Sequence, residues 1–168
     1  MVRDQIWSSL CNYKFASYIV SQLIMKYQKQ ERTLNIILAL TSSASVAAWA
    51  IWQMYPLLWS LIIAISQVIS VAKPYFPFSK YVRELNSKSV VLENFVIEFE
   101  RLWSKMQTKR ISEDSAEETH FEMKKQAIKL LEFSEDTIVN ASEKMIAKGN
   151  EQMKNYLWTN YKIEIKTK

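Results

Sequence analysis

The stretch TLNIILALTSSASVAAWAIWQMYPLLWSLIIAISQVISVA, residues 33–72, contains no charged side chain, although 23% of the 168-residue chain is charged. A membrane-spanning helix needs about 20 predominantly apolar residues, so this stretch is long enough to cross a bilayer twice. The segment from Gln53 to Pro56 lies near its middle, where a turn would divide it. The sequence therefore predicts a transmembrane hairpin with spans at residues 33–53 and 56–72.

The composition of the whole chain favours helices. One glycine and three prolines are present, far below the usual roughly 7% and 5%, which argues against a turn-rich β architecture. We expect an all-α protein with three parts. These are an N-terminal amphipathic helix at residues 1–32, the transmembrane hairpin at 33–72, and a cytoplasmic helical domain at 73–168 that forms a helical hairpin or coiled-coil-like bundle.

Basic residues flank the uncharged stretch on both sides and are missing from its central turn: Lys26, Lys29, Arg32, Lys73, Lys80 and Arg83. Cytoplasmic loops carry such residues, so both termini are expected in the cytoplasm. The net charge of +5 is not concentrated in either flanking part, and no direct nucleic-acid binding is predicted. The first 30 residues show no signal-peptide pattern, so the hairpin itself is expected to direct the chain to the membrane.

Residues 3–29 carry apolar side chains at a mostly three-and-four spacing, which predicts an amphipathic helix. The members of this face are Ile6, Leu10, Tyr13, Val20, Leu23, Ile24 and Tyr27. Such a helix can lie in the membrane interface or pack onto the later helices. The absence of a strongly basic polar face favours packing.

Small and polar residues recur on both predicted spans. Ala39, Ser43 and Ala47 form a small-xxx-small row on the first span, and Ser60, Ala64, Gln67 and Ser70 share a face on the second. Small residues let membrane helices approach closely, and hydroxyl and amide groups bond between helices. The same stripe could instead line a water-filled path in an oligomer. Spacing alone favours helix packing.

Aromatic residues gather near the turn and beyond the second span, as in the aromatic belts of membrane interfaces. They are Trp49, Trp52, Tyr55, Trp59, Tyr75 and Phe76. A ligand cage around the turn is the alternative, but the belt accounts for these positions without a ligand. The segment Lys73–Pro77 carries two prolines and is expected to end the second span.

A long amphipathic helix is predicted from Ser79, because apolar residues recur there in a heptad pattern. This seam consists of Leu85, Leu92, Phe95, Phe99, Leu102 and Met106. A second helix is predicted after a capping-box pattern at Ser115 and Glu118, with a C-cap at Gly149-Asn150. The seam of the second helix includes small residues and can bury little apolar area. Its members are Ala127, Leu131, Ser134, Ile138, Ala141 and Met145. It therefore needs a partner helix from the same or another chain.

The residues that usually carry catalysis are missing. His120 is the only histidine, Cys11 is the only cysteine, and the single glycine excludes a glycine-rich phosphate loop. A zinc site needs three or four converging ligands, so His120 is expected to be solvated or at the edge of the seam. The sequence predicts no enzyme, no metal and no cofactor.

The arrangement resembles the SLATT group of two-transmembrane effectors from bacterial conflict systems. The shared features are a short N-terminal helix, the uncharged hairpin with Pro56 at its turn, Lys73-Pro74 at its exit, and long amphipathic helices. The family has no short diagnostic motif, so no catalytic residue is carried over. The resemblance implies a bacterial inner-membrane effector of anti-phage defence, which oligomerises and perturbs the membrane to kill or arrest the cell.

The resemblance also implies a separate sensor partner, either a nucleotide-signal synthase or sensor, or a reverse transcriptase with its DNA. With this prior, the stripe on the second span becomes the expected pore lining, and the seam from Leu85 to Met106 becomes the expected oligomer or partner surface. Two alternatives remain. One is a membrane-anchored helical scaffold without pore activity, and the other is a soluble bundle that buries residues 33–72.

Overall fold

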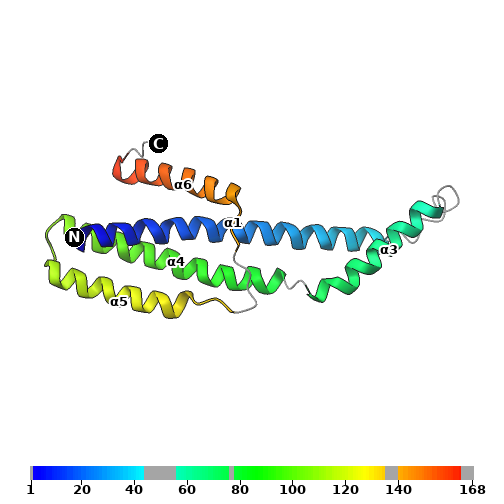
Figure 1. The fold of residues 1–168 in the computed structure, drawn as a ribbon, viewed down its shortest axis with the longest axis horizontal. Coiled ribbons are helices and arrows are strands. Elements are labelled where there is room, and N and C mark those ends of the chain that lie inside the picture. Colours follow the sequence, from blue (N-terminus) through cyan, green and yellow to red (C-terminus); the bar gives the residue numbers. More distant parts are fainter. Residues whose placement is uncertain (1, 44–55, 76–77, 135–139, 164–168) are drawn as a thin grey trace. The chain divides into compact units, whose positions relative to one another are not determined.

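The computed structural model describes residues 2–43, 56–75, 78–134 and 140–163, and every regular element in these ranges is helical (Figure 1). The elements are α1 (Val2–Ser43), α3 (Pro56–Ala72), the short 3-10 helix η1 (Lys73–Tyr75), α4 (Phe78–Gln107), α5 (Glu113–Leu131) and α6 (Glu143–Tyr161). The predicted all-α class is therefore confirmed. The chain forms two compact units: Met1–Ile24 with Arg83–Lys168, and Met25–Val82.

The first unit has a core to which α1, α4 and α5 each contribute one face. The heptad pattern of α4 places its apolar residues on one side of the helix, where they bury against α1 and α5. The small residues of α5 allow close approach of its backbone. The buried core residues are Ile6, Leu10, Phe95, Val96, Phe99, Leu102, Ala116 and Ala127. Within this unit the N-terminal helix packs onto later helices, as the missing basic face predicts.

Helix α6 packs along α1 through Gly149, which lies inside the helix and has a negative φ. The prediction that Gly149-Asn150 forms a C-cap is therefore wrong. A Cβ atom at Gly149 would lie 3.0 Å from Ile19 Cδ1 and 3.0 Å from Phe15 Cε2. The glycine permits close approach of the two helices. The helix ends instead at Lys162, whose left-handed φ of 57° lets its backbone N–H donate to the last turn.

Two further boundaries differ from the sequence prediction. Helix α5 is capped by Ser112, whose Oγ accepts from the Ser115 backbone N–H at 3.3 Å, so Ser115 lies inside the helix and is not its cap. The predicted helix through Ser134 is also wrong, because α5 ends at Leu131. The Ser134 N–H donates to Glu84 Oε1 at 2.7 Å instead of to a helical carbonyl. Ile138 lies outside the described residues.

The second unit contains the apolar helix α3 and the later part of α1. Helix α1 continues without a break past residue 33 to Ser43, and α3 begins at Pro56 and ends at Ala72, the bounds predicted for the second span. Proline suits the first turn of a helix, where its missing N–H has no helical partner. The predicted first span beyond Ser43 and the central turn lie outside the described residues.

Candidate functional site

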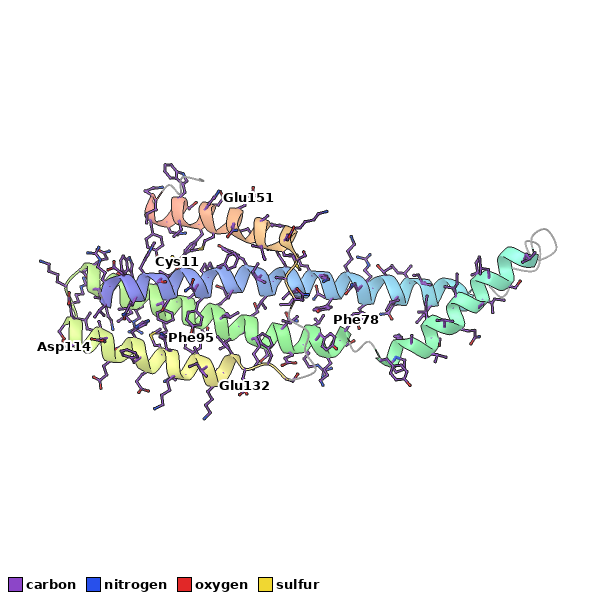
Figure 2. All side chains as sticks on the ribbon, viewed as in Figure 1. Cys11, Phe78, Phe95, Asp114, Glu132 and Glu151 are labelled. Carbon is purple, nitrogen blue, oxygen red and sulfur yellow. The ribbon has the colours of Figure 1, made fainter. Side chains whose placement is uncertain are left out.

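The surface of α3 is unusual because large apolar side chains are exposed along its length. Leu57 is 85% exposed, Val68 and Val71 are each 68% exposed, and Leu61 and Ile65 are at least half exposed. Figure 2 shows side chains projecting from this helix along its length. Contiguous exposed apolar surface marks a site that contacts another protein or a membrane. This surface is therefore the candidate functional site.

The predicted polar stripe lies on this exposed helix: Ser60, Ala64, Gln67 and Ser70 are all exposed. The Ser60 hydroxyl donates to the Leu57 carbonyl at 3.3 Å, and Ser66 donates to the Ile62 carbonyl at 2.7 Å. The side-chain amide of Gln67 has no hydrogen-bond partner among the described residues. The Gln67 amide, with two donors and an acceptor, is therefore the largest hydrogen-bonding group of this stripe that requires water or a second chain.

The small-residue row of the first span is only partly described. Ala39 is exposed on α1. The side chain of Ser43 and all of Ala47 lie outside the described part of the structure. The predicted close approach of these small residues to another helix therefore stays a prediction.

Length and hydropathy decide which of the described helices could cross a membrane. No single helix among them is both long and apolar enough to cross a membrane. One bent pair, Ser60–Tyr75 with Phe78–Gln107, meets the criteria together, with a bend of 40° at the break. Helix α3 itself has 17 residues.

The two ends of the uncharged stretch lie side by side in the second unit. Leu34 and Asn35 from the start of the stretch line the same hollow as Lys73 and Pro74, which follow its end. Glu31 Oε1 accepts a hydrogen bond from Ser79 Oγ across the same hollow. The start of the uncharged stretch on α1 and the segment that follows α3 thus line one hollow.

The predicted oligomer or partner seam of α4 lies in the chain's own core. Leu85, Leu92, Phe95, Phe99 and Leu102 are buried, and Met106 packs partly buried against the core. Phe95, labelled in Figure 2, stacks on Tyr13 of α1 with ring centroids 5.8 Å apart. Contact of these residues with another chain would require the helices of the first unit to separate.

His120 is a core residue, a placement that the sequence analysis missed. It is 2% exposed, its Nε2 lies 2.9 Å from Ser9 Oγ, and its ring meets Phe99 edge-on at 5.8 Å. Its Nδ1 has no hydrogen-bond partner among the described residues. Burial lowers the pKa of His120 below the ordinary value, and nearby Lys124 lowers it further while Glu117 raises it. The spacing of His120 from Ala116 and Ala127 was the available signal for its burial.

A polar cluster joins α6 to α1 and α4. Lys14 Nζ lies 3.1 Å from Glu93 Oε2 and 5.3 Å from the ring centres of both Tyr18 and Tyr156. The Tyr156 hydroxyl donates to Glu100 Oε1. Burial and this bond to a carboxylate raise the pKa of Tyr156, so its hydroxyl keeps its proton. These contacts hold α6 against α1 and α4 and therefore have a structural role.

No group of three or more histidine, cysteine or acidic side chains among the described residues could hold a metal ion. Comparisons of the chain with protein-family models, curated proteins and solved structures give no match.

Proposed function

We propose that the protein is a membrane effector of a bacterial anti-phage defence system. A sensor partner activates it, and it then oligomerises and permeabilises the inner membrane, which causes cell death or growth arrest. The observation that supports a membrane location is the exposed apolar surface of α3. Leaving this surface in water would be unfavourable by about 25 cal/mol for each Å² of apolar area, whereas lipid would cover it.

The length of α3 supports insertion of a short hairpin. A helix rises about 1.5 Å per residue, so 17 residues span about 25 Å. The hydrocarbon core of a bilayer is about 30 Å thick, and spanning helices range from about 17 to 25 residues. Tyr75, which is 80% exposed next to Lys73, suits the membrane interface where α3 ends.

Gln67 supports assembly of several copies. In hydrocarbon an unpaired amide is costly, because neither water nor backbone groups satisfy it. The hydroxyls of Ser60 and Ser66 bond within the helix, whereas the Gln67 amide does not. A second copy of α3 or a water-filled path supplies the missing partners. With Ser60 and Ser70, Gln67 would then face the interior of the oligomer.

The defence role follows from the resemblance of the chain's arrangement to the SLATT group. The partners implied are membrane lipid, further copies of this chain and a separate sensor. The sensor would be a nucleotide-signal synthase or sensor, or a reverse transcriptase with its DNA. Both termini would lie in the cytoplasm, where the first unit can meet this partner.

Dye release from liposomes tests the pore. The purified full chain, reconstituted and cross-linked into oligomers, should release a small encapsulated dye. Gln67→Leu should reduce the release, whereas Ser66→Ala should leave it unchanged because Ser66 bonds within its own helix. Absence of release in every oligomeric state would refute pore formation.

The alternative function is a membrane-anchored helical scaffold without pore activity. Exposed apolar residues on the first unit favour a partner-binding role, notably Phe121 at 56% and Ile128 at 77% exposure on α5. A scaffold would insert in membranes without dye release, its overexpression would be harmless, and Gln67→Leu would be silent.

A further inference from the structure

Two adjoining hollows lie where the uncharged stretch begins and ends. The first has a volume of about 280 Å³ and places polar groups of α1 opposite the α3 exit; its polar lining residues are Glu31, Asn35, Lys73 and Ser79. Its apolar lining residues are Leu34, Pro74 and Phe78. The hollow thus combines charge, hydrogen-bonding groups and an apolar wall.

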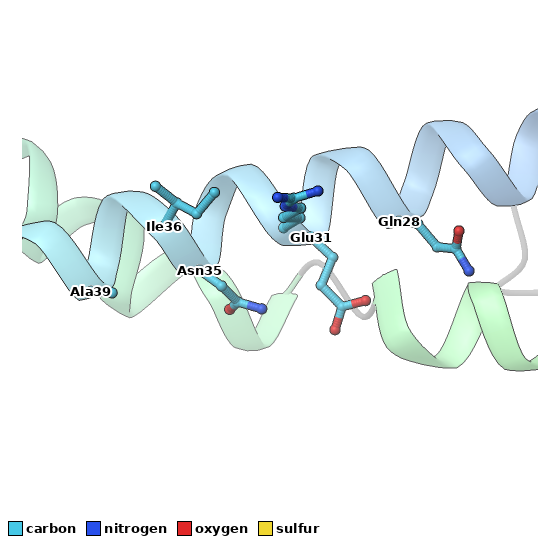
Figure 3. A pocket seen from close by; sticks show the side chains of 6 residues that line it. Gln28, Glu31, Asn35, Ile36 and Ala39 are labelled. Atoms are coloured by element: carbon cyan, nitrogen blue, oxygen red, sulfur yellow. The ribbon is translucent and has the colours of Figure 1, made fainter.

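The second hollow shares Glu31 and Asn35 with the first and extends along α1. Gln28 and Arg32 line its polar part, and Ile36 and Ala39 line its apolar part. Figure 3 shows Gln28, Glu31 and Asn35 directed to the same side of α1. Polarity therefore changes along the helix from charged and amide groups to aliphatic groups.

Both signs of charge are present in this region. Arg32 and Lys73 are the last and first charged residues around the uncharged stretch, and they line the two hollows that Glu31 joins. Ser79 donates to Glu31 Oε1, which holds the carboxylate in place. Oε2 of Glu31 has no partner in the part of the chain that the structure describes. One carboxylate oxygen is thus available to accept a hydrogen bond, and each of the two hollows also has one cationic side chain.

We propose that these hollows bind the headgroup of phosphatidylethanolamine, an inference that rests on the proposed insertion of the hairpin in a membrane. The phosphate lies with Lys73, which provides a charge-assisted donor, and Arg32 adds positive charge from the adjoining hollow. The ammonium donates to Glu31 and to the amide oxygen of Asn35. The aliphatic part of the α1 hollow, at Ile36 and Ala39, takes the start of an acyl chain.

The acceptors in the site favour a primary ammonium over other headgroups. A primary ammonium has three N–H donors, as a lysine side chain does, whereas the trimethylammonium of phosphatidylcholine has none. Phosphatidylglycerol offers phosphate without a cation for Glu31. Basic pockets on the cytoplasmic side of membrane helices bind lipid headgroups.

Thermal unfolding of the full chain in detergent micelles tests this site. Phosphatidylethanolamine added to the micelles should raise the melting temperature by about 2–5 °C, more than phosphatidylcholine or phosphatidylglycerol does, because a ligand of the folded state stabilises it. Glu31→Gln and Asn35→Leu should each abolish the preference. Glu118→Gln, which removes an exposed carboxylate on α5, should retain it.

Each other outcome overturns the inference. Equal shifts for the three lipids, or a preference that survives both Glu31→Gln and Asn35→Leu, show that the hollows do not select an ammonium. A larger shift with phosphatidylglycerol shows that they bind anions only. Dye release is measured separately, so these results leave the proposed function standing. A chain that neither inserts nor releases dye refutes both.

Discussion

Replacing Phe99 with alanine should strongly destabilise the first unit. Phe99 is fully buried on α4, stacks on Tyr13 at 5.1 Å and meets His120 edge-on at 5.8 Å. Truncation of a buried phenylalanine costs about 3–5 kcal/mol, and each aromatic pair contributes about 0.5–1.5 kcal/mol beyond its buried area. We therefore expect Phe99→Ala to cost about 4–5 kcal/mol. At about 2–4 °C per kcal/mol, the melting temperature should fall by about 8–20 °C.

Circular dichroism of the detergent-solubilised chain measures this change, with size-exclusion chromatography alongside. Ile97→Ala is the matched control, because Ile97 lies on the same helix and is 56% exposed. It should change the free energy of unfolding by about 0.5 kcal/mol or less. If Phe99→Ala cost under about 1 kcal/mol but dissociated an oligomer, the seam would be an interface between chains and the reasoning would be wrong.

Three other changes test the packing of the first unit. Gly149→Leu should destabilise it by about 1–3 kcal/mol in urea denaturation because α6 touches α1 there, whereas Ala147→Leu, at an exposed position, should have little effect. Tyr156→Phe should cost about 1–2 kcal/mol by loss of its bond to Glu100, and most of this cost should disappear in a Glu100→Ala background, which removes the acceptor. Since the folded-state pKa of His120 is below its ordinary 6.5, the unfolded chain binds a proton first as pH falls. Stability should therefore decrease from about pH 6.5 downward, and His120→Gln should remove this dependence.

Strong periodicity made the long helices predictable from sequence. The recurrence of Leu85, Leu92 and Phe99 at seven-residue intervals predicted α4 and its buried face, and Pro56 predicted the start of α3. The sequence could not assign the seam to the chain's own core, because a heptad pattern is the same whether the partner helix belongs to the same chain or to another.

Helix ends and tertiary neighbours were harder to predict. Ser112 and Ser115 are both suitable caps, and only the observed bond from the Ser115 N–H selects Ser112. Gly149 resembles a helix stop, yet it lies within α6 because Phe15 and Ile19 leave no room for a side chain. The burial of His120 depends on Ser9 and Phe99, which are distant in sequence.

We propose above all that α3 lies in a membrane. Alkaline carbonate extraction of membranes from bacteria that express the full chain tests it most directly, because carbonate strips peripheral proteins and leaves inserted ones. The account predicts that the chain stays in the membrane pellet. Recovery of the chain in the supernatant would contradict the account and favour a bundle that buries the uncharged stretch.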